Sequence, residues 1–180
     1  MLAYVFWHWP AASRDAAAYE AAECEFHAAL AASRPSGFGG SAVYRVGGEA
    51  PWLGGSPAYA DWYLVQDSAA LDPLNVAAVS GACEAPHRRL TRAMGAGAGS
   101  LLQLRSGTAD LNSARYVTWL VKPREMAYDA FYAAHALVPG TVWRRQMVLG
   151  PTPEFAIVSS APVQIHGSLS PRVLTLTPLA

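Results

Sequence analysis

Hydrophobic and polar residues follow two different periods along this chain, and these periods divide it into strands and helices. Residues 3–9 carry aromatic and β-branched side chains and end at a proline, which predicts a strand. Residues 13–32 are rich in alanine and place large apolar side chains at helical spacing, which predicts a helix. Segments rich in glycine and proline interrupt the pattern. Between them we expect strands at 41–46, 59–66 and 101–105, a helix at 67–82 and a short helical piece at 86–94.

The opening pattern occurs again in the second half of the chain. Residues 4–7 (Tyr-Val-Phe-Trp) match residues 116–119 (Tyr-Val-Thr-Trp), and each is followed by an alanine-rich segment and a turn region with proline and glycine. Similar segments in a fixed order indicate one structural unit used twice. We place the units at 1–107 and 112–180, the second of them reduced. In the second unit we expect strands at 116–121, 141–149, 154–160 and 172–177 and one helix at 124–137.

The order of elements in the first unit, β-α-β-β-α-β, is that of a ferredoxin-like fold. Its first strand carries Val5 and Trp7 on one face and Tyr4 and Phe6 on the other, so both faces are apolar. A half-solvated sheet would alternate apolar and polar residues, so we expect helices on one face and the sister sheet on the other. The sequence therefore predicts an α+β fold, with two fused ferredoxin-like units that close one barrel around a small lumen.

Charge and composition exclude several classes of partner. The chain has 13 Lys and Arg residues against 13 Asp and Glu residues, with no basic stripe, so we expect no nucleic-acid partner. It lacks the run of about 20 apolar residues that a membrane span needs and opens without the basic region of a signal peptide. We therefore expect a cytoplasmic protein with no membrane partner. Cys24 and Cys83 have no metal-binding spacing, so we expect free thiols and no metal site.

Three histidines are candidate catalytic residues. His8 lies at the end of the first strand on the face of Tyr4 and Phe6, where an imidazole could act as a general base if that face lines the lumen. His27 and His135 recur at one position of the repeat, near the end of each long helix. The alternative for His8 is a strand-end side chain satisfied by backbone or water. The alternative for the other two is a favourable interaction with the helix dipole.

Aromatic side chains supply the candidate ligand-binding residues, which are Tyr4, Phe6, Tyr44, Tyr63 and Tyr116. Aromatic walls with a few polar tips suit a flat apolar ligand. The alternative is a core that these aromatic side chains pack solid.

Three further patterns favour structural roles. Asp61 and Glu154 begin matching strands, but strand starts on opposite halves are normally apart and solvated, so we do not expect these carboxylates to converge. Glu23 lies four residues before His27, the spacing of a helical ion pair. The run Gly95–Gly99 follows a helix and precedes a strand, which is the wrong order for a phosphate-binding loop, so we expect a flexible link.

Residues 131–140 (Phe-Tyr-Ala-Ala-His-Ala-Leu-Val-Pro-Gly) resemble the helix end of the EthD-like proteins, and residues 25–30 are a weaker copy. These proteins belong to the dimeric α/β-barrel superfamily, together with the cofactor-free antibiotic-biosynthesis monooxygenases. The resemblance implies a ferredoxin-like fold and a lumen that takes a small, often aromatic or polyketide-like molecule. It carries the helix-end histidine of the family over to His135 and His27. The chain departs from the family by being a tandem fusion with a reduced second half.

Together these observations predict a small-molecule-binding protein. We expect acid/base or oxygenation chemistry without a cofactor on an aromatic or polyketide-like substrate, with a histidine taking a proton while Tyr4, Tyr44 and Tyr63 orient the ligand. Haem bound through one histidine is the alternative cofactor. A non-catalytic binding, sensing or structural module is the alternative function, since the fold does not choose among these activities. A homodimer could form through the outer helices.

Overall fold

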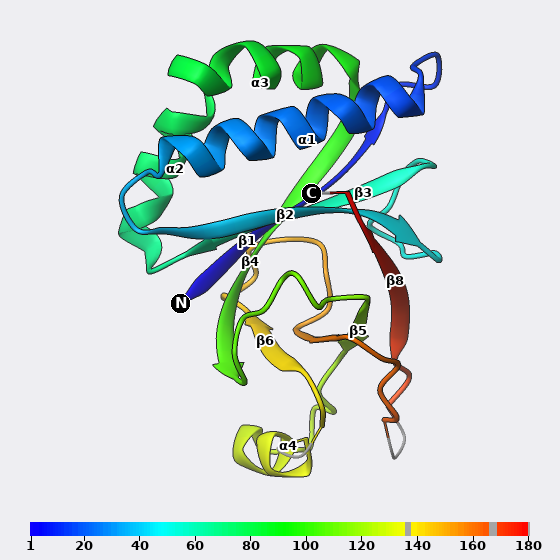
Figure 1. The fold of residues 1–180 in the computed structure, drawn as a ribbon. Helices are drawn as coiled ribbons and strands as arrows, with labels where there is room; N and C mark the ends of the chain where they lie inside the picture. The colour runs from blue at the N-terminus through cyan, green and yellow to red at the C-terminus, as the bar shows by residue number, and fades with distance from the viewer. Residues whose placement is uncertain (136–137, 166–168, 180) are drawn as a thin grey trace.

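A computed structural model describes residues 1–135, 138–165 and 169–179 of the 180-residue chain (Figure 1). Its strands are β1 (Leu2–Pro10), β2 (Phe38–Gly47), β3 (Ala58–Val65), β4 (Met94–Ser106), β5 (Tyr116–Leu120), β6 (Thr141–Arg145), β7 (Phe155–Ser159) and β8 (Arg172–Pro178). Its helices are α1 (Ala16–Ser33), the short 3₁₀ helix η1 (Ser68–Ala70), α2 (Leu71–Ala78), α3 (Gly81–Ala93) and α4 (Tyr128–Ala134). Each expected strand and helix has a counterpart along the described chain. The expected helix at 67–82 is divided between η1, α2 and the start of α3, and residues 136–137 of the expected helix at 124–137 lie outside the described residues.

The strands form one closed antiparallel barrel in the order β1-β3-β2-β8-β5-β7-β6-β4. The first half of the chain contributes β4-β1-β3-β2, and the second half contributes β8-β5-β7-β6, which is the same order of corresponding strands. The pairs β2–β8 and β4–β6 join the halves. The prediction of an α+β barrel closed within one chain is thus confirmed. The duplication, with units at 1–107 and 112–180, stays a prediction.

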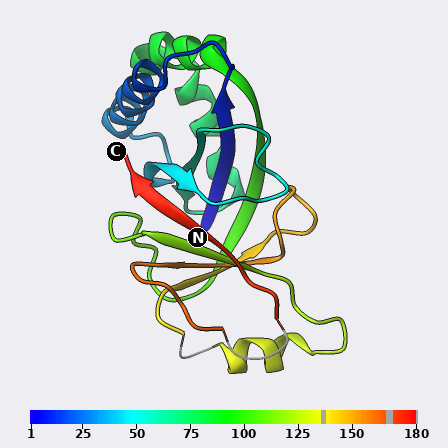
Figure 2. The same ribbon diagram turned by 90° about the vertical axis from the view of Figure 1, so that its right-hand side faces the viewer.

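Helices cover the two halves of the barrel unequally. Helices α1, α2 and α3 lie together over the first half of the sheet, whereas α4 lies at the opposite end of the molecule (Figures 1 and 2). Helix α1 begins at the N-cap Asp15, which accepts a hydrogen bond from the Ala17 backbone N–H, and ends at Arg34 in the left-handed conformation. No helix in the described ranges is long and apolar enough to cross a membrane.

The interior of the barrel is filled by tryptophans. Alternate residues of all the strands point inward and form one buried cluster, which includes Trp7, Trp62, Trp119 and Trp143. The ring centroids of Trp7 and Trp119 are 5.7 Å apart, and those of Trp62 and Trp143 are 5.8 Å apart. The prediction of a ligand-binding lumen is therefore wrong. The alternative, a core packed by aromatic side chains, describes the barrel interior. The faces of β1 are also assigned: Val5 and Trp7 point into the barrel, and Tyr4 and Phe6 point towards the helices.

The glycine run is part of a long strand. Residues Gly95–Gly99 belong to β4, so the expected flexible link is wrong. A Cβ atom built at Gly97 would lie 2.4 Å from the Phe6 ring, and one built at Gly99 would lie 2.7 Å from the Tyr4 ring. The two aromatic rings of β1 therefore lie across the glycines of the neighbouring strand, and this close approach requires residues without a side chain.

Candidate active site

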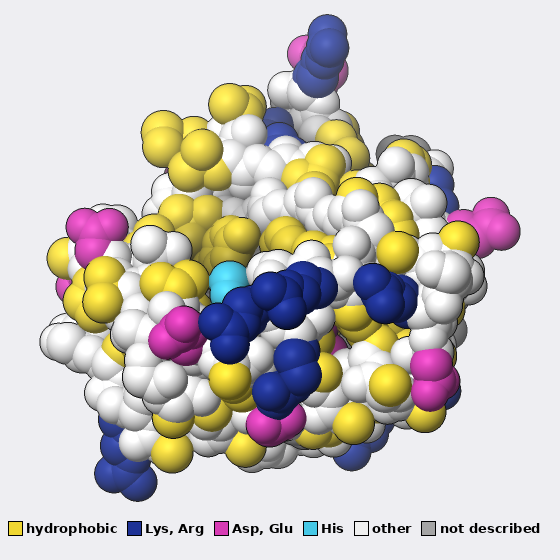
Figure 3. All heavy atoms as spheres, turned by 90° about the horizontal axis from the view of Figure 1, so that it is seen from above, with side chains coloured by type: hydrophobic (Ala, Val, Ile, Leu, Met, Phe, Trp, Pro, Cys, Tyr) yellow, Lys and Arg dark blue, Asp and Glu magenta, His cyan; other side chains and the backbone are white. Residues whose placement is uncertain are grey.

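A cavity of about 440 Å³ lies outside the barrel, between strands of its first half and the helices α1, α2 and α3. Its wall is largely apolar and includes Tyr4, Phe6, Phe26, Leu30, Leu74 and Leu90. Polar side chains enter the wall at Glu23, Asp61, Tyr63, Asn75, His87 and Thr91. On the face shown in Figure 3, hydrophobic side chains line a hollow beside a histidine and a group of basic side chains. Such a cavity suits a small, flat, mostly apolar molecule.

The register of two neighbouring strands brings the polar side chains of the sheet together. Phe6 of β1 is opposite Asp61 of β3, and His8 is opposite Tyr59. Because alternate residues of a strand share a face, these side chains and that of Tyr63 point towards the helices. Of the four polar side chains, Asp61 and Tyr63 contribute to the cavity wall, whereas His8 and Tyr59 lie outside its lining.

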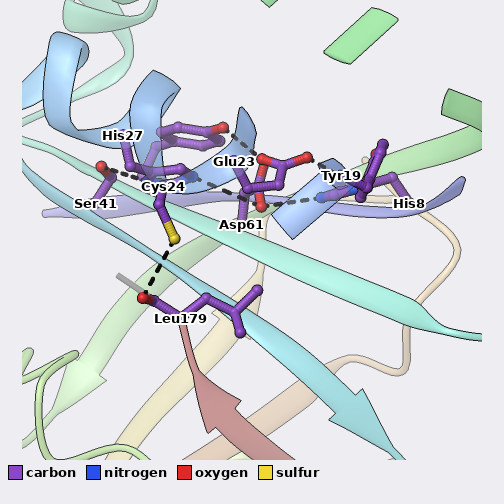
Figure 4. A network of polar contacts seen from close by, with 9 residues as sticks. His8, Tyr19, Glu23, Cys24, His27, Ser41, Asp61 and Leu179 are labelled. Atoms are coloured by element: carbon purple, nitrogen blue, oxygen red, sulfur yellow. Dashed lines mark hydrogen bonds and ion pairs between the residues drawn. The ribbon is translucent and has the colours of Figure 1, made fainter. Parts of the chain in front are cut away.

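Helix α1 supplies the other side of the site. Its buried residues are Tyr19, Glu23, Phe26, His27 and Leu30. Their spacing of mostly three or four positions places them along one side of the helix. Figure 4 shows Tyr19, Glu23 and His27 from α1 meeting His8 and Asp61 from the sheet in one polar network.

Asp61 is the centre of this network. Its Oδ1 atom lies 3.0 Å from His8 Nε2 and 3.7 Å from His27 Nε2, and its Oδ2 atom accepts a hydrogen bond of 2.8 Å from the Tyr63 hydroxyl. Burial alone would raise the pKa of Asp61, but the charge of His8, its hydrogen bond to Oδ1 and the nearby His27 outweigh burial and lower the pKa below its usual range. Asp61 is therefore ionised although it is 4% exposed.

Glu23 is in the opposite protonation state. It is 1% exposed, and burial and the nearby charge of Asp61 raise its pKa to about 10, against a smaller lowering by Tyr19. At neutral pH it is therefore a neutral carboxylic acid. Its Oε2 atom has no hydrogen-bond partner in the described protein, and Glu23 contributes to the cavity wall. A ligand in the cavity could therefore take a hydrogen bond from Glu23.

His8 lies behind the wall with both ring nitrogens engaged. Nε2 is 3.0 Å from Asp61 Oδ1, and Nδ1 is 2.7 Å from the Tyr19 hydroxyl and 3.7 Å from Glu23 Oε1. With a proton on Nε2, the ring donates to Asp61 Oδ1, while Nδ1 shares a hydrogen bond with the Tyr19 hydroxyl. His8 thus positions Asp61 from behind.

His27 and Tyr63 complete the support of Asp61. His27 Nδ1 is hydrogen-bonded to Ser41 Oγ at 2.8 Å, and its ring stacks on that of Tyr63 with centroids 5.3 Å apart. Burial and then the charge of Asp61 raise the pKa of the Tyr63 hydroxyl well above its ordinary value. Tyr63 therefore stays a hydrogen-bond donor at neutral pH.

The network fits hydrogen bonding better than metal binding. His8, Glu23 and Asp61 each place one possible ligand atom within 4.8 Å of the others. The ligands of a metal ion must all point at one centre. Here Asp61 lies on the Nε2 side of the His8 ring and Glu23 on the Nδ1 side. An ion bound to Nε2 beside Asp61 would have the His8 ring between it and Glu23, and an ion bound to Nδ1 beside Glu23 would have the ring between it and Asp61.

The structure brings five of the sequence candidates to one place. His8, His27, Tyr4, Phe6 and Tyr63 all lie on the helix-facing side of the first half-sheet. This side lies outside the barrel. The prediction that these residues line the lumen is therefore wrong, because the tryptophan core fills the barrel interior.

Three other candidates lie elsewhere. Tyr44 points into the barrel interior, where its hydroxyl donates to the Leu111 backbone carbonyl. Tyr116 lies on β5 in the second half of the sheet, opposite Ser159. His135 follows α4, and its Nδ1 is hydrogen-bonded to the Phe131 carbonyl at 2.7 Å. The helix-end histidines His27 and His135 therefore do not share a site.

Sequence reasoning missed the acidic residues of the site. Asp61 was expected to be solvated, and Glu23 was expected to pair with His27, whereas Glu23 lies nearest His8. The supposed counterpart of Asp61, Glu154, instead accepts hydrogen bonds from Arg144 and Tyr128. The one available signal was a lone acid in an otherwise apolar strand, Ala58–Val65. Such a residue is buried only with partners.

The second half has no equivalent of the network at the corresponding strand positions. There β5 pairs with β7 so that Thr118 is opposite Ile157 and Leu120 is opposite Phe155. Matched from Tyr4 and Tyr116 onward, Ile157 takes the place of Asp61 and Leu120 takes the place of His8. The polar network is therefore a feature of the first half.

Comparison with known proteins identifies the fold. No protein-family model and no curated protein matches the sequence. A candidate monooxygenase from Fusobacterium nucleatum superposes with a TM-score of 0.58 at 8% identity, over 99% of this chain and 92% of that chain. One from Lactobacillus acidophilus gives 0.54 at 12% identity, over 99% and 94%. An anthrone oxidase-like protein gives 0.48 at 10% identity, over 98% and 91%.

The chain shares the fold of monooxygenase-like barrel proteins. At these identities the likeness extends to the fold alone, so any activity has to be argued from the site.

Proposed function

We propose that the protein is an enzyme that removes a proton from a flat, largely apolar small molecule held in the cavity below α1. The observation that carries the proposal is the pair of buried acids that line the cavity, one from the sheet and one from α1. Asp61 is ionised and Glu23 is protonated, with their pKa values displaced in opposite directions. Acids whose environments separate their pKa values in this way take the roles of base and acid.

The chemistry that fits is enolisation next to a carbonyl group. Asp61 takes the proton from the acidic carbon, and the electron pair of that C–H bond forms a carbon–carbon double bond. The carbonyl π electrons move to the oxygen, where Glu23 donates a hydrogen bond from its free side. The negative charge thus passes from Asp61 to the substrate oxygen. The aromatic and aliphatic walls bind the flat ring system and exclude water.

The test is hydrogen–deuterium exchange of 2-tetralone, a flat ketone with an acidic C–H group. In deuterated buffer the wild-type protein should accelerate exchange at the carbon next to the carbonyl, read by NMR. Asp61→Asn should slow the catalysed exchange by about 100-fold or more, the usual contribution of a positioned base. Glu23→Gln should slow it by a smaller factor, because its amide group still donates a hydrogen bond.

The matched control is Glu25→Gln, the same substitution on the same helix at a side chain that is 57% exposed. It should exchange at the wild-type rate. Binding of 2-tetralone with no exchange above the buffer rate would refute catalysis and favour the alternative of a non-catalytic binding module.

Oxygenation is a second candidate, supported by the names of the proteins that share the fold. The enolate carbon would combine with dioxygen to a peroxide, which takes the proton from Asp61 and loses water. A CH₂ group and O₂ then become C=O and H₂O, with no other reductant. Oxygen uptake that depends on the ketone and on Asp61 would support this step, and exchange without uptake would limit the activity to proton transfer.

A further inference from the structure

The Tyr63 hydroxyl contacts the proposed base at the wall of the ligand cavity. It donates a hydrogen bond of 2.8 Å to Asp61 Oδ2, and both residues contribute to the cavity wall. Its ring is held by stacking on Tyr4 and His27, with centroids 6.1 Å and 5.3 Å away. The ring is therefore fixed, whereas the hydroxyl hydrogen is free to turn about the C–O bond.

The strength of the Tyr63–Asp61 bond depends on the proton state of Asp61. A hydrogen bond to a carboxylate is roughly twice as strong as one between neutral groups. Once Asp61 has taken a proton, the strongest acceptor left in the cavity is the negatively charged oxygen of the substrate. Tyr63 remains protonated because burial and Asp61 raise its pKa.

We propose that Tyr63 is a catalytic residue that exchanges acceptors during the reaction, leaving Asp61 as it is protonated and donating to the substrate oxyanion. The inference rests on the proposed function and adds a second oxyanion donor to Glu23. No covalent bond changes at Tyr63: one hydrogen bond is given up and another is formed as the charge moves. Before the reaction the Tyr63 hydroxyl donates to Asp61, and it becomes available to the substrate only after Asp61 has taken the proton.

The test uses 2-naphthol, whose anion has the shape and charge of the enolate of 2-tetralone, and Asp61→Asn as a mimic of protonated Asp61. The apparent pKa of bound 2-naphthol is read from its absorbance. In the Asp61→Asn background, Tyr63→Phe should raise that pKa by about one unit, a tenfold change in ionisation constant. With Asp61 intact, the same substitution should change it much less, because Tyr63 there donates to Asp61.

Tyr59→Phe is the matched control. Tyr59 is a buried phenol of the same strand whose hydroxyl donates to Glu20 at 2.8 Å, away from the cavity. It should leave the pKa of bound 2-naphthol unchanged in both backgrounds. If Asp61→Asn lowers folding yield, the exchange of 2-tetralone by Tyr63→Phe gives the second measurement: kcat should fall about tenfold or more with KM nearly unchanged, as for a donor used only in the transition state.

An equal effect of Tyr63→Phe in the two backgrounds would overturn the acceptor exchange, since it would show a donor that does not respond to Asp61. Failure of 2-naphthol to bind at all would also overturn it. Both outcomes are separate from failure of the proposed function, which is a lack of 2-tetralone exchange by the wild-type protein.

Discussion

Glu23 makes the stability of the protein depend on pH. Its pKa is about 10 in the folded protein against an ordinary value of 4.5, so the folded state binds more protons between these two values. Its contribution to stability is therefore complete below about pH 4.5 and is lost as the pH rises towards 10. Asp61 acts in the opposite sense, but its lowered pKa confines the effect to acid solution. Holding Glu23 neutral at pH 7 costs roughly 3 kcal/mol.

Replacing Glu23 by glutamine should remove this dependence, because an amide keeps the shape of the acid and does not ionise. Urea unfolding between about pH 5 and pH 9 should show wild-type stability falling with pH and the Glu23→Gln curve nearly flat, with a difference of a few kcal/mol at the alkaline end. The exposed control Glu25→Gln should follow the wild type. A Glu23→Gln curve parallel to the wild type would mean that Glu23 is ionised in the folded protein.

Among the elements, α1 shows what a sequence pattern can and cannot reveal. Its alanines and apolar spacing were enough to predict the helix, and the repeated pattern of strands was enough to predict the sheet. The partner of Glu23 was not predictable, because His8 lies on a strand in the other layer and the contact depends on how the layers pack. The buried side of α1 also mixes apolar residues with Glu23 and His27, which weakens the amphipathic signal that would have marked it.

Strand β4 was misread for a related reason. Glycine predicts flexibility when only neighbours in sequence are considered, whereas here Gly97 and Gly99 make room for rings from β1. Gly99→Ala should therefore push the Tyr4 ring out of place, lower stability by about 1–3 kcal/mol and weaken 2-tetralone binding. Gly39→Ala is the control, since its Cβ would meet Leu64 at 3.4 Å, an ordinary contact. Equal urea midpoints for the two variants would contradict this account.

At the scale of the whole molecule, the sequence predicted a barrel closed within the chain but placed the ligand on the wrong side of it. The alternation along β1 shows which residues share a face, and not which face points inward. Both faces are aromatic, so hydrophobicity could not separate them. Which face points inward depends on the size of the side chains. The bulky indoles of Trp7, Trp119 and Trp143 fill the barrel interior, where strands from both halves meet.

The core and the cavity should accordingly respond separately to mutation. Trp143→Ala removes an indole that is 1% exposed and should lower the free energy of unfolding by about 3–5 kcal/mol. Its folded fraction should still bind 2-tetralone with wild-type affinity, measured by titration below the unfolding transition. Val148→Ala, at a side chain that is 83% exposed, should stay within about 0.5 kcal/mol of the wild type. Weakened binding by the folded Trp143→Ala protein would show that the ligand enters the barrel.

The replacement of Asp61 and His8 by Ile157 and Leu120 at the corresponding positions of the second half has a consequence for stoichiometry. The two halves share a strand order, yet the residues of the proposed active site all lie in the first half. The second half of the chain acts as a scaffold that closes the barrel. Each polypeptide should then bind a single equivalent of ligand. Substitutions around Ile157 should change the free energy of unfolding rather than the rate of turnover.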